Sequence, residues 1–583
     1  MMRFDTLIRG GMIVDGSGQE PFAADLAIKD RRIAAIGRIE GEADEIIDAT
    51  GKLVTPGFVD IHTHYDGQIT WENRMRPSSD HGVTTVVMGN CGVGFAPCRP
   101  HQRDMLVEVM EGVEDIPEVV MTEGLPWNWE SFPDYLDVLA GRQADVDFAA
   151  QIPHSPVRVY VMGERGAARE AATADELQQM RAIVGDAVAA GALGVTTSRN
   201  HGHRTVAGEL APSVDADRAE LLALAQGLAD AGTGVFQMIP NAHYGDDPQA
   251  DMALFKDIVA ASGRPLSFSL LQKKFQRDLP ETMLAMLRDY NRDAAIPIRA
   301  QVFPRPIGML FGLELSFHPF RFHPSFQPLA DLPLAEKVAA LRDPALRARL
   351  LAEQPVTDNP LYQMLATDVG DLYPMGDPPN YEPPAETRLG ARAEREGRNP
   401  AELALDALLE RDGRGLLMMP SSNYVDGNLD MARLMISDPN TIIALGDGGA
   451  HYSLICDSSF PTFVLTHWVR DRGEGRLPLA WAVRQLSHEP ARAVGLEDRG
   501  LLRVGYKADV NVIDPERLEL PAPTIVYDLP AGGRRLVQHA RGYDLTMVSG
   551  AITYRGGEAT GALPGRLVRG AQSAPAVEET KAA

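Results

Sequence analysis

The stretch Thr55-Pro-Gly-Phe-Val-Asp-Ile-His62-Thr-His64 is an apolar run that ends in two histidines one residue apart. Such a run is typical of a buried strand, on which successive side chains point to opposite faces. His62 and His64 therefore share a face and can reach the same ion. A lone histidine is more often a hydrogen-bonded residue than a ligand, but two at this spacing on a strand end favour half of a metal site.

Length and charge limit what the chain can be. It has 583 residues, which is more than one hydrophobic core usually supports, so we expect more than one domain. Its 56 Lys and Arg against 80 Asp and Glu give a net charge of −24, which argues against nucleic acid or a membrane as partner. Three cysteines, no signal-peptide pattern and no bilayer-spanning run predict a cytoplasmic protein.

Eight short apolar segments, several followed by amphipathic helical patterns, predict a parallel (β/α)8 TIM-like barrel over residues 57–489. One of the helices is expected to begin at the capping box Thr173-Ala-Asp-Glu176 and to end near Gly191. The eight expected strands are 57–62, 83–89, 147–152, 193–198, 234–239, 265–271, 297–303 and 441–446.

The segments outside the predicted barrel strands and helices show other sequence patterns. Residues 1–56 predict a small antiparallel sheet, and with 490–569 they are expected to form one β-sandwich, while 570–583 reads as a loose tail. The interval 304–440 is predicted to be an insertion between the seventh and eighth barrel strands. Its phenylalanines favour packing in an apolar cluster, with a lid over the active site as the alternative. Phe303 lies just before this interval, and the phenylalanines near its start are Phe311, Phe317, Phe320, Phe322 and Phe326.

Candidate ligands follow three of the expected strands, at the end where barrel active sites lie. His62 and His64 follow the first strand, Cys91 the second and Asp447 the eighth. Two histidines, a thiolate and a carboxylate form a complete tetrahedral set for zinc. Cys91 alone could be a small buried residue and Asp447-Gly-Gly alone a turn, so their joint placement carries the prediction.

A zinc ion would lower the pKa of a bound water from about 15.7 to about 7 and polarise a carbonyl. A catalytic ion needs an open position, so one ligand must bind weakly or Asp447 must have a second role. Asp447 could take the proton of the water and pass it to a leaving amine. These residues predict hydrolysis without a covalent intermediate.

Several stretches resemble the metal-dependent amidohydrolases, in particular the D-aminoacylase (N-acyl-D-amino-acid deacylase) branch. They are Asp5-Thr-Leu-Ile-Arg-Gly-Gly11, Pro56 to His64, Gly82-Val-Thr-Thr-Val-Val-Met-Gly-Asn-Cys91-Gly, Asp447-Gly-Gly and Gly505-Tyr-Lys-Ala-Asp-Val-Asn-Val-Ile-Asp514. The resemblance implies zinc held by His62, His64, Cys91 and Asp447, with Asp447 as general base. It also implies substrate-side roles for His154 and Arg158, with a structural role as the alternative for Arg158.

The chain departs from this branch at the fifth and sixth strands. Gln237 and Leu270 stand where the branch has further histidine ligands, so we expect one zinc ion per chain. His243 is an alternative ligand if the register differs, although a surface loop histidine is the preferred interpretation. No lysine ends the fourth strand to bridge two metals, which ranks hydantoinase-like chemistry second.

The branch also has an arginine after the eighth strand for the substrate carboxylate, and the segment 448–460 contains none. Arg199 and Arg204, which flank Asn200-His201-Gly-His203, could bind a carboxylate through their forked donors, or be solvated loop charges. His203 is a candidate substrate contact, with a surface role as the alternative.

These patterns predict a zinc-dependent hydrolase of a small-molecule amide, and the resemblance implies a linear amide, most favourably an N-acyl amino acid of the D configuration. Hydrolysis of another amide, a carbamate or a cyclic amide is the second interpretation. A third is an amidohydrolase-like scaffold without catalysis. A homo-oligomer is expected only by resemblance, and the acyl group and amino acid are left open.

Overall fold

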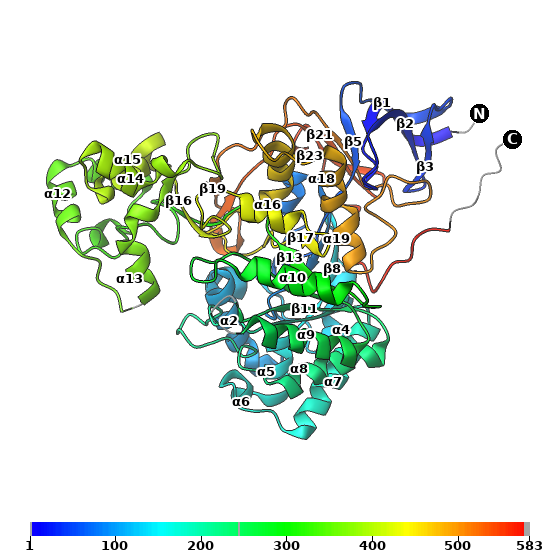
Figure 1. Cartoon of the computed structure of the whole chain (residues 1–583), viewed down its shortest axis with the longest axis horizontal. Helices are drawn as coiled ribbons and strands as arrows, with labels where there is room; N and C mark the ends of the chain where they lie inside the picture. Colours follow the sequence, from blue (N-terminus) through cyan, green and yellow to red (C-terminus); the bar gives the residue numbers. More distant parts are fainter. Residues whose placement is uncertain (1–2, 243–244, 246, 359, 577–583) are drawn as a thin grey trace.

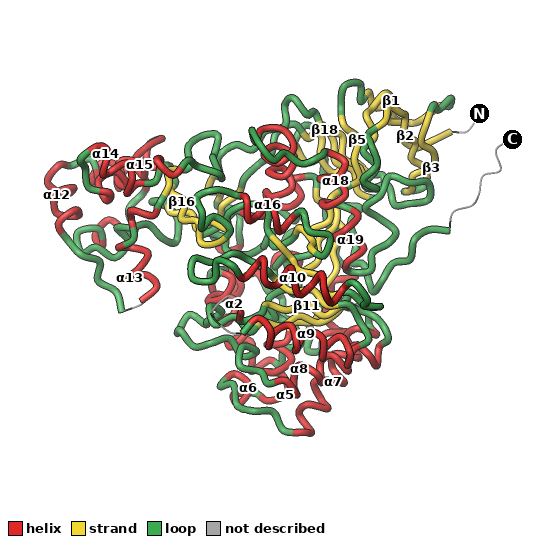
Figure 2. Tube along the Cα trace, viewed as in Figure 1, coloured by secondary structure: helices red, strands yellow, loops and turns green. Residues whose placement is uncertain are grey.

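A computed structural model describes residues 3–242, 245, 247–358 and 360–576. Parallel strands form the centre of the molecule, with helices around them (Figures 1 and 2). Each segment predicted as a barrel strand contains a strand, and the third contains two. They are β6 (Phe58–Asp60), β7 (Val83–Met88), β8 (Asp147–Ala150), β9 (Ile152–Pro153), β10 (Gly194–Ser198), β11 (Val235–Ile239), β12 (Leu266–Ser269), β13 (Ile298–Val302) and β17 (Thr441–Ile443).

These strands pair in chain order. One sheet is β6-β7-β8 and the other is β9-β10-β11-β12-β13-β17, with every pair parallel. Only Gln151 separates β8 from β9, and Thr63 pairs in parallel with Gly448 beyond the ends of β6 and β17. The carboxyl ends of the first and last strands therefore meet.

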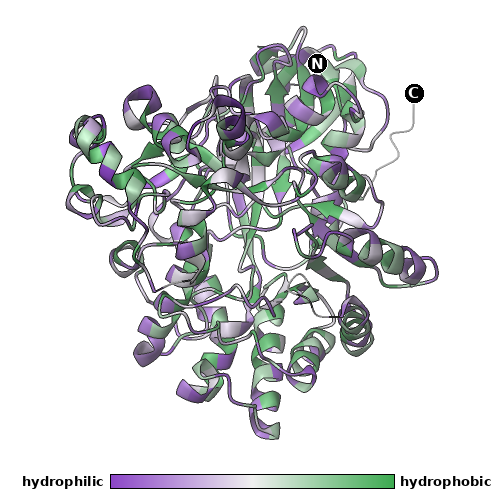
Figure 3. Cartoon of the chain, turned by 60° about the vertical axis from the view of Figure 1, so that its left-hand side comes forward, coloured by the Kyte–Doolittle hydropathy of each residue, from purple (hydrophilic) through white to green (hydrophobic). Residues whose placement is uncertain are grey.

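Amphipathic helices cover the outer side of these strands. They include α7 (Ala174–Ala189), α8 (Arg218–Ala231), α9 (Pro248–Ser262) and α10 (Leu279–Asn291). Thr173 caps α7 and forms the predicted capping box with Glu176, which satisfies backbone groups at the helix start. Figure 3 shows hydrophobic colour along the central strands and mixed colour on the helices around them, as expected of elements with one solvated face.

Much of the segment predicted as an insertion forms the lobe on the left of Figure 1. It contains an antiparallel sheet, β14 (Ile307–Phe311), β16 (Leu417–Ser422) and β15 (Tyr373–Pro374), and the helices α11 (Leu334–Leu341), α12 (Pro344–Ala352), α13 (Pro360–Thr367), α14 (Leu389–Glu396) and α15 (Pro400–Gly413). Four of its phenylalanines are buried in a separate apolar core, and Phe322 packs against that core. Phe303 belongs to the main core instead. These contacts favour the packing role.

Both ends of the described chain contribute to one nine-stranded sheet. Its strands are β1 (Arg3–Ile13), β2 (Phe22–Lys29), β3 (Arg32–Gly37), β4 (Glu42–Asp48), β5 (Leu53–Pro56), β18 (Val510–Ile513), β21 (Tyr543–Val548), β22 (Ala551–Arg555) and β23 (Glu558–Ala559). The expectation of an antiparallel N-terminal sheet was wrong in part, because β4 and β5 pair in parallel with β1. At 11 residues, β1 is long enough to pair with both in succession along one edge.

No helix within the described ranges combines the length and the apolar composition needed to cross a bilayer.

Candidate metal centre

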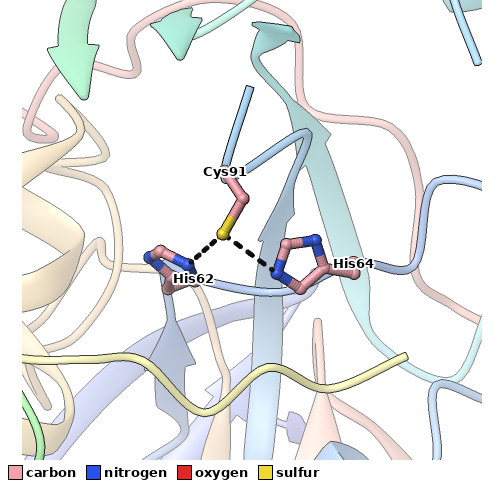
Figure 4. Close-up of side chains that lie close together, drawn as sticks. All are labelled: His62, His64 and Cys91. Atoms are coloured by element: carbon pink, nitrogen blue, oxygen red, sulfur yellow. Dashed lines mark hydrogen bonds between the residues drawn. The ribbon is translucent and has the colours of Figure 1, made fainter. Parts of the chain in front are cut away.

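His62 and His64 lie just past β6, and their imidazoles point toward Cys91 (Figure 4). The Cys91 Sγ atom is 3.4 Å from His62 Nε2 and 3.7 Å from His64 Nε2. Asp447 lies beside both histidines, with its Oδ1 atom 3.4 Å from His62 Nε2 and 3.5 Å from His64 Nε2. Zn²⁺ in tetrahedral coordination, with Zn–N of about 2.0 Å and Zn–S of about 2.3 Å, separates its ligand atoms by roughly 3.3–3.6 Å. The distances of Cys91 and Asp447 from the two histidines are close to these values, but Asp447 lies outside the group of mutually close ligand atoms.

Local backbone geometry brings Cys91 to this position. After β7, Gly89 has φ +86°, and a Cβ atom there would lie 2.1 Å from the carbonyl oxygen of Gln151. Only glycine fits such an approach. Cys91 itself has φ +57°, a left-handed conformation that is uncommon outside glycine and clusters at functional sites.

The loop after β17 presents Asp447 in a similar way. Its backbone N–H donates to His62 O at 3.1 Å, and the N–H of His64 donates to Gly448 O at 2.7 Å. Gly449 has φ +91°, and a Cβ atom there would lie 2.8 Å from the backbone of His64. The Asp-Gly-Gly sequence is thus needed for the loop to pack directly on the histidine strand. Asp447 Oδ1 is buried and lacks a hydrogen-bond partner among the described residues, as expected of an atom that binds an ion.

Each histidine has a partner on the side away from Cys91. His62 Nδ1 lies 2.7 Å from Gln301 Oε1, and the Gln301 amide donates to Ser267 Oγ at 2.9 Å. His64 Nδ1 lies 3.5 Å from Oε1 of Glu114, the last residue of α2 (Arg103–Glu114). Sequence reasoning did not find Gln301 or Glu114, since neither belongs to a recognisable motif. The arrangement leaves the Nε2 atoms of both histidines free to bind a metal.

Burial dominates the electrostatics of the centre. It raises the pKa of Cys91 to about 12 and lowers that of His62 to about 4. Burial also raises the pKa of Glu114 to about 7, a rise that the charge of His64 opposes. Burial alone would raise the pKa of Asp447, but the contact with His64 and the charge of His62 outweigh it and hold that pKa well below its usual range. Asp447 is thus ionised at neutral pH, whereas the Cys91 thiol needs a neighbouring cation to ionise.

His154 and Arg158 lie in a buried cluster between α5 (His154–Met162) and α8. His154 Nε2 is 2.8 Å from Glu220 Oε1 and its Nδ1 is 2.8 Å from Thr197 Oγ1. Arg158 forms an ion pair with Glu220 and donates to the carbonyl oxygens of Gly166 and Glu170. These bonds occupy both imidazole nitrogens and every guanidinium nitrogen, which favours the structural alternative for this pair.

The other three substrate candidates follow β10 and differ in setting. Arg204 is exposed and donates to Gly208 O, whereas Arg199 pairs with Asp251 at 3.3 Å. His203 is half-buried, and burial, with the charges of His451 and His64, lowers its pKa to about 3. His203 is thus the candidate among the three that interacts electrostatically with the metal centre.

The two positions that depart from the branch point inward. Gln237 pairs in register with Thr196 and Ser267, and both polar atoms of its buried side chain lack a hydrogen-bond partner among the described residues. Leu270 is buried in the main core. His243 lies outside the described residues. Among the His, Cys, Asp and Glu side chains of the described residues, one group of three has potential metal-ligand atoms that all lie within 4.8 Å of one another. It consists of His62, His64 and Cys91.

Candidate nitrogen, sulfur and oxygen ligands at the carboxyl ends of parallel strands are the arrangement expected of a metal-dependent α/β protein. Residues 45–554 match the family model described as "Amidohydrolase family". The chain therefore belongs to the amidohydrolase family.

One curated relative matches almost the whole chain, and another matches a third of it. The chain is 28% identical to a D-aminoacylase of Alcaligenes xylosoxydans xylosoxydans over 97% of both proteins. It is 36% identical to an N-acyl-D-aspartate deacylase of the same organism over 33% of this chain and 36% of that protein.

Solved structures show the same fold. A D-aminoacylase matches with a TM-score of 0.64 and 23% identity, covering 97% of this chain and 100% of that one. An N-acyl-D-glutamate deacylase from Bordetella bronchiseptica, complexed with zinc and a phosphonate inhibitor, matches with a TM-score of 0.61, 23% identity and the same coverage. Another D-aminoacylase structure, with a TM-score of 0.64, 22% identity and the same coverage, is described as having a binuclear metal center, with one-metal activation and second-metal attenuation.

Proposed function

We propose that this chain is a zinc-dependent hydrolase of linear amides and that its substrate is an N-acyl amino acid, with the D configuration favoured. The observation that carries the proposal is the close grouping of the ligand atoms of His62, His64 and Cys91, with the Asp447 carboxylate beside both histidines. Relatives named D-aminoacylase and N-acyl-D-aspartate deacylase support the substrate class. Because Gln237 and Leu270 replace the branch's further histidines, we infer one zinc ion per chain.

Each residue of the centre has a role in this proposal. His62, His64 and Cys91 would hold the ion with Asp447 as a fourth, more weakly bound ligand, and the ion when bound acidifies water and polarises an amide carbonyl. Asp447 would accept a proton from the attacking water and return it to the leaving amine as the carbon–nitrogen bond breaks. The pKa of Asp447 lies well below its usual range, so the carboxylate is ionised at neutral pH, which is the form that can accept a proton.

Among the five candidate substrate-binding residues, His203 and Arg199 are the two that we expect to contact the substrate. His203 Nδ1 and Arg199 Nε are buried and lack hydrogen-bond partners among the described residues. A substrate oxygen could accept from either group. Arg204 stays a candidate at the exposed edge of the same loop. His154 and Arg158 would act indirectly, by fixing the start of α5.

We also infer that the parallel strands close into one (β/α)8 barrel spanning 57–489. The pairing of Thr63 with Gly448 and the single residue between β8 and β9 support closure. The segment 304–440 would be the insertion, 1–56 with 490–569 the β-sandwich, and 570–583 a tail. A cytoplasmic location and a homo-oligomer stay predictions.

The test is amino acid release from N-acetyl-D- and N-acetyl-L-amino acids by wild type and by Asp447→Asn. We expect wild type to release the D-amino acid, and Asp447→Asn to lower turnover by roughly 10²- to 10⁴-fold with folding and zinc content nearly intact, because the proton carrier is lost. Asp430→Asn, at a side chain that is 74% exposed, serves as the control. Near-normal turnover of Asp447→Asn would remove Asp447 from the mechanism. Activity confined to carbamates or cyclic amides would favour the second interpretation.

A further inference from the structure

Glu114 is a buried carboxylate beside the proposed metal centre that the ligand set does not use. Its side chain is 1% exposed, and neither oxygen has a hydrogen-bond partner among the described residues. Burying a carboxylate without such partners is costly, so an acid at this position is unfavourable for stability alone. The other buried residues of α2 are apolar: Leu106, Val107, Val109, Met110 and Val113.

The carboxylate of Glu114 lies between two imidazoles. Its Oε1 atom is 3.5 Å from His64 Nδ1, and its Oε2 atom is 3.4 Å from His451 Nε2. The backbone N–H of His451 also donates to the carbonyl oxygen of Glu114, which ties the end of α2 to the loop that carries Asp447. His451 has φ +51°, and its side chain is 26% exposed. Glu114 thus connects a proposed ligand to a partly exposed histidine.

We propose that Glu114 is a positioning residue of the metal centre, which orients His64 through Oε1 and His451 through Oε2. The inference rests on the proposed function. A neutral imidazole carries one proton, so a hydrogen on Nδ1 directed at Glu114 leaves the lone pair of Nε2 facing Cys91 and Asp447. A carboxylate on the far nitrogen also makes a histidine a stronger ligand.

The two histidines would therefore have Nδ1 partners of different charge. His62 has the neutral amide oxygen of Gln301 on its far side, whereas His64 has the carboxylate of Glu114. A carboxylate accepts a stronger hydrogen bond than an amide oxygen does. Removing the charge of Glu114 should then weaken the metal site while the shape of the core is preserved.

The test uses Glu114→Gln, which keeps the size of the side chain and removes its charge. Glu108→Gln is the matched control, because Glu108 is exposed on the same helix. Two quantities are measured on the full chain: the zinc dissociation constant, by competition with a chelator, and the absorption spectrum of the Co²⁺-substituted protein. We expect Glu114→Gln to weaken zinc binding by about 10- to 100-fold and to alter the Co²⁺ bands, and Glu108→Gln to match wild type.

Wild-type zinc affinity and an unchanged Co²⁺ spectrum in folded Glu114→Gln would overturn the proposal. If that variant does not fold, Glu114→Asp keeps the charge but shortens the side chain, and it should weaken zinc binding in the same direction. An unchanged zinc affinity in Glu114→Asp would then overturn the proposal that Glu114 positions His64. Failure of the wild-type chain to bind zinc would instead overturn the proposed function on which this inference rests.

Discussion

At the scale of single residues, the candidate centre depends on a thiol that does not ionise by itself. Burial raises the pKa of Cys91 to about 12, so the thiolate forms only when a cation such as zinc is close. Cys91 also holds a left-handed backbone conformation, with φ +57°. This left-handed backbone is costly for an ordinary core residue, and a role as metal ligand accounts for it.

We expect Cys91→Ser to lower zinc retention strongly, because a hydroxyl is a far weaker zinc ligand than a thiolate. The measurement is the zinc-to-protein ratio after dialysis against a weak chelator. Cys98→Ser is the matched control, since Cys98 is also buried but packs in a separate apolar cluster, away from the candidate ligands. Equal retention in both variants would return Cys91 to a packing role.

The four candidate ligands could be predicted because each follows a strand with a strong apolar pattern, and strand ends of a parallel sheet meet. Glu114 could not be predicted in this way. It ends a helix in the long connection between β7 and β8, and its contact with His64 depends on how that helix packs. The resemblance predicted substrate-side roles for His154 and Arg158. Their pairing with Glu220 could not be predicted, because Glu220 lies 62 positions beyond Arg158 and no local motif marks it.

At the scale of elements, Glu220 joins α8 to α5 through an ion pair that is buried at both ends. Burial would raise the pKa of Glu220, but the hydrogen bond from His154 and the charges of His154 and Arg158 outweigh it and hold the pKa at about 2. The folded pKa is thus below the ordinary value of 4.5. The stabilisation is therefore fully present above about pH 4.5 and is lost as the pH falls toward 2.

We expect Glu220→Gln to lower the free energy of unfolding by about 3 kcal/mol at neutral pH, because Arg158 is left buried without its counter-charge. The difference from wild type should shrink as the pH falls from 4.5 toward 2, where wild type loses the same interaction. Thermal unfolding as a function of pH measures it, with Glu164→Gln at an exposed position of α6 (Glu164–Ala167) as control. A difference that does not vary with pH would contradict the linkage.

At the scale of the whole molecule, a buried charge cluster joins the central strands to the segment that leads into the nine-stranded sheet. Asp147, at the start of β8, accepts from Arg499 at 2.8 Å and pairs with Lys507 at 2.7 Å. The segment that carries these cations leads into β18 of the nine-stranded sheet.

The apolar periodicity of the sequence located the strands of both the central region and the nine-stranded sheet. It could not show that β1 pairs with β4 and β5 along one edge, because strand partners are fixed by long-range packing.

We propose that each chain binds one zinc ion through His62, His64, Cys91 and Asp447. Elemental analysis of purified protein, with a His62→Ala/His64→Ala double variant beside it, tests this proposal without knowledge of the substrate. We predict one zinc per wild-type chain and none in the variant. Two zinc ions per chain would contradict the single-ion site, and no zinc in wild type, even after zinc is supplied, would contradict the metal centre itself.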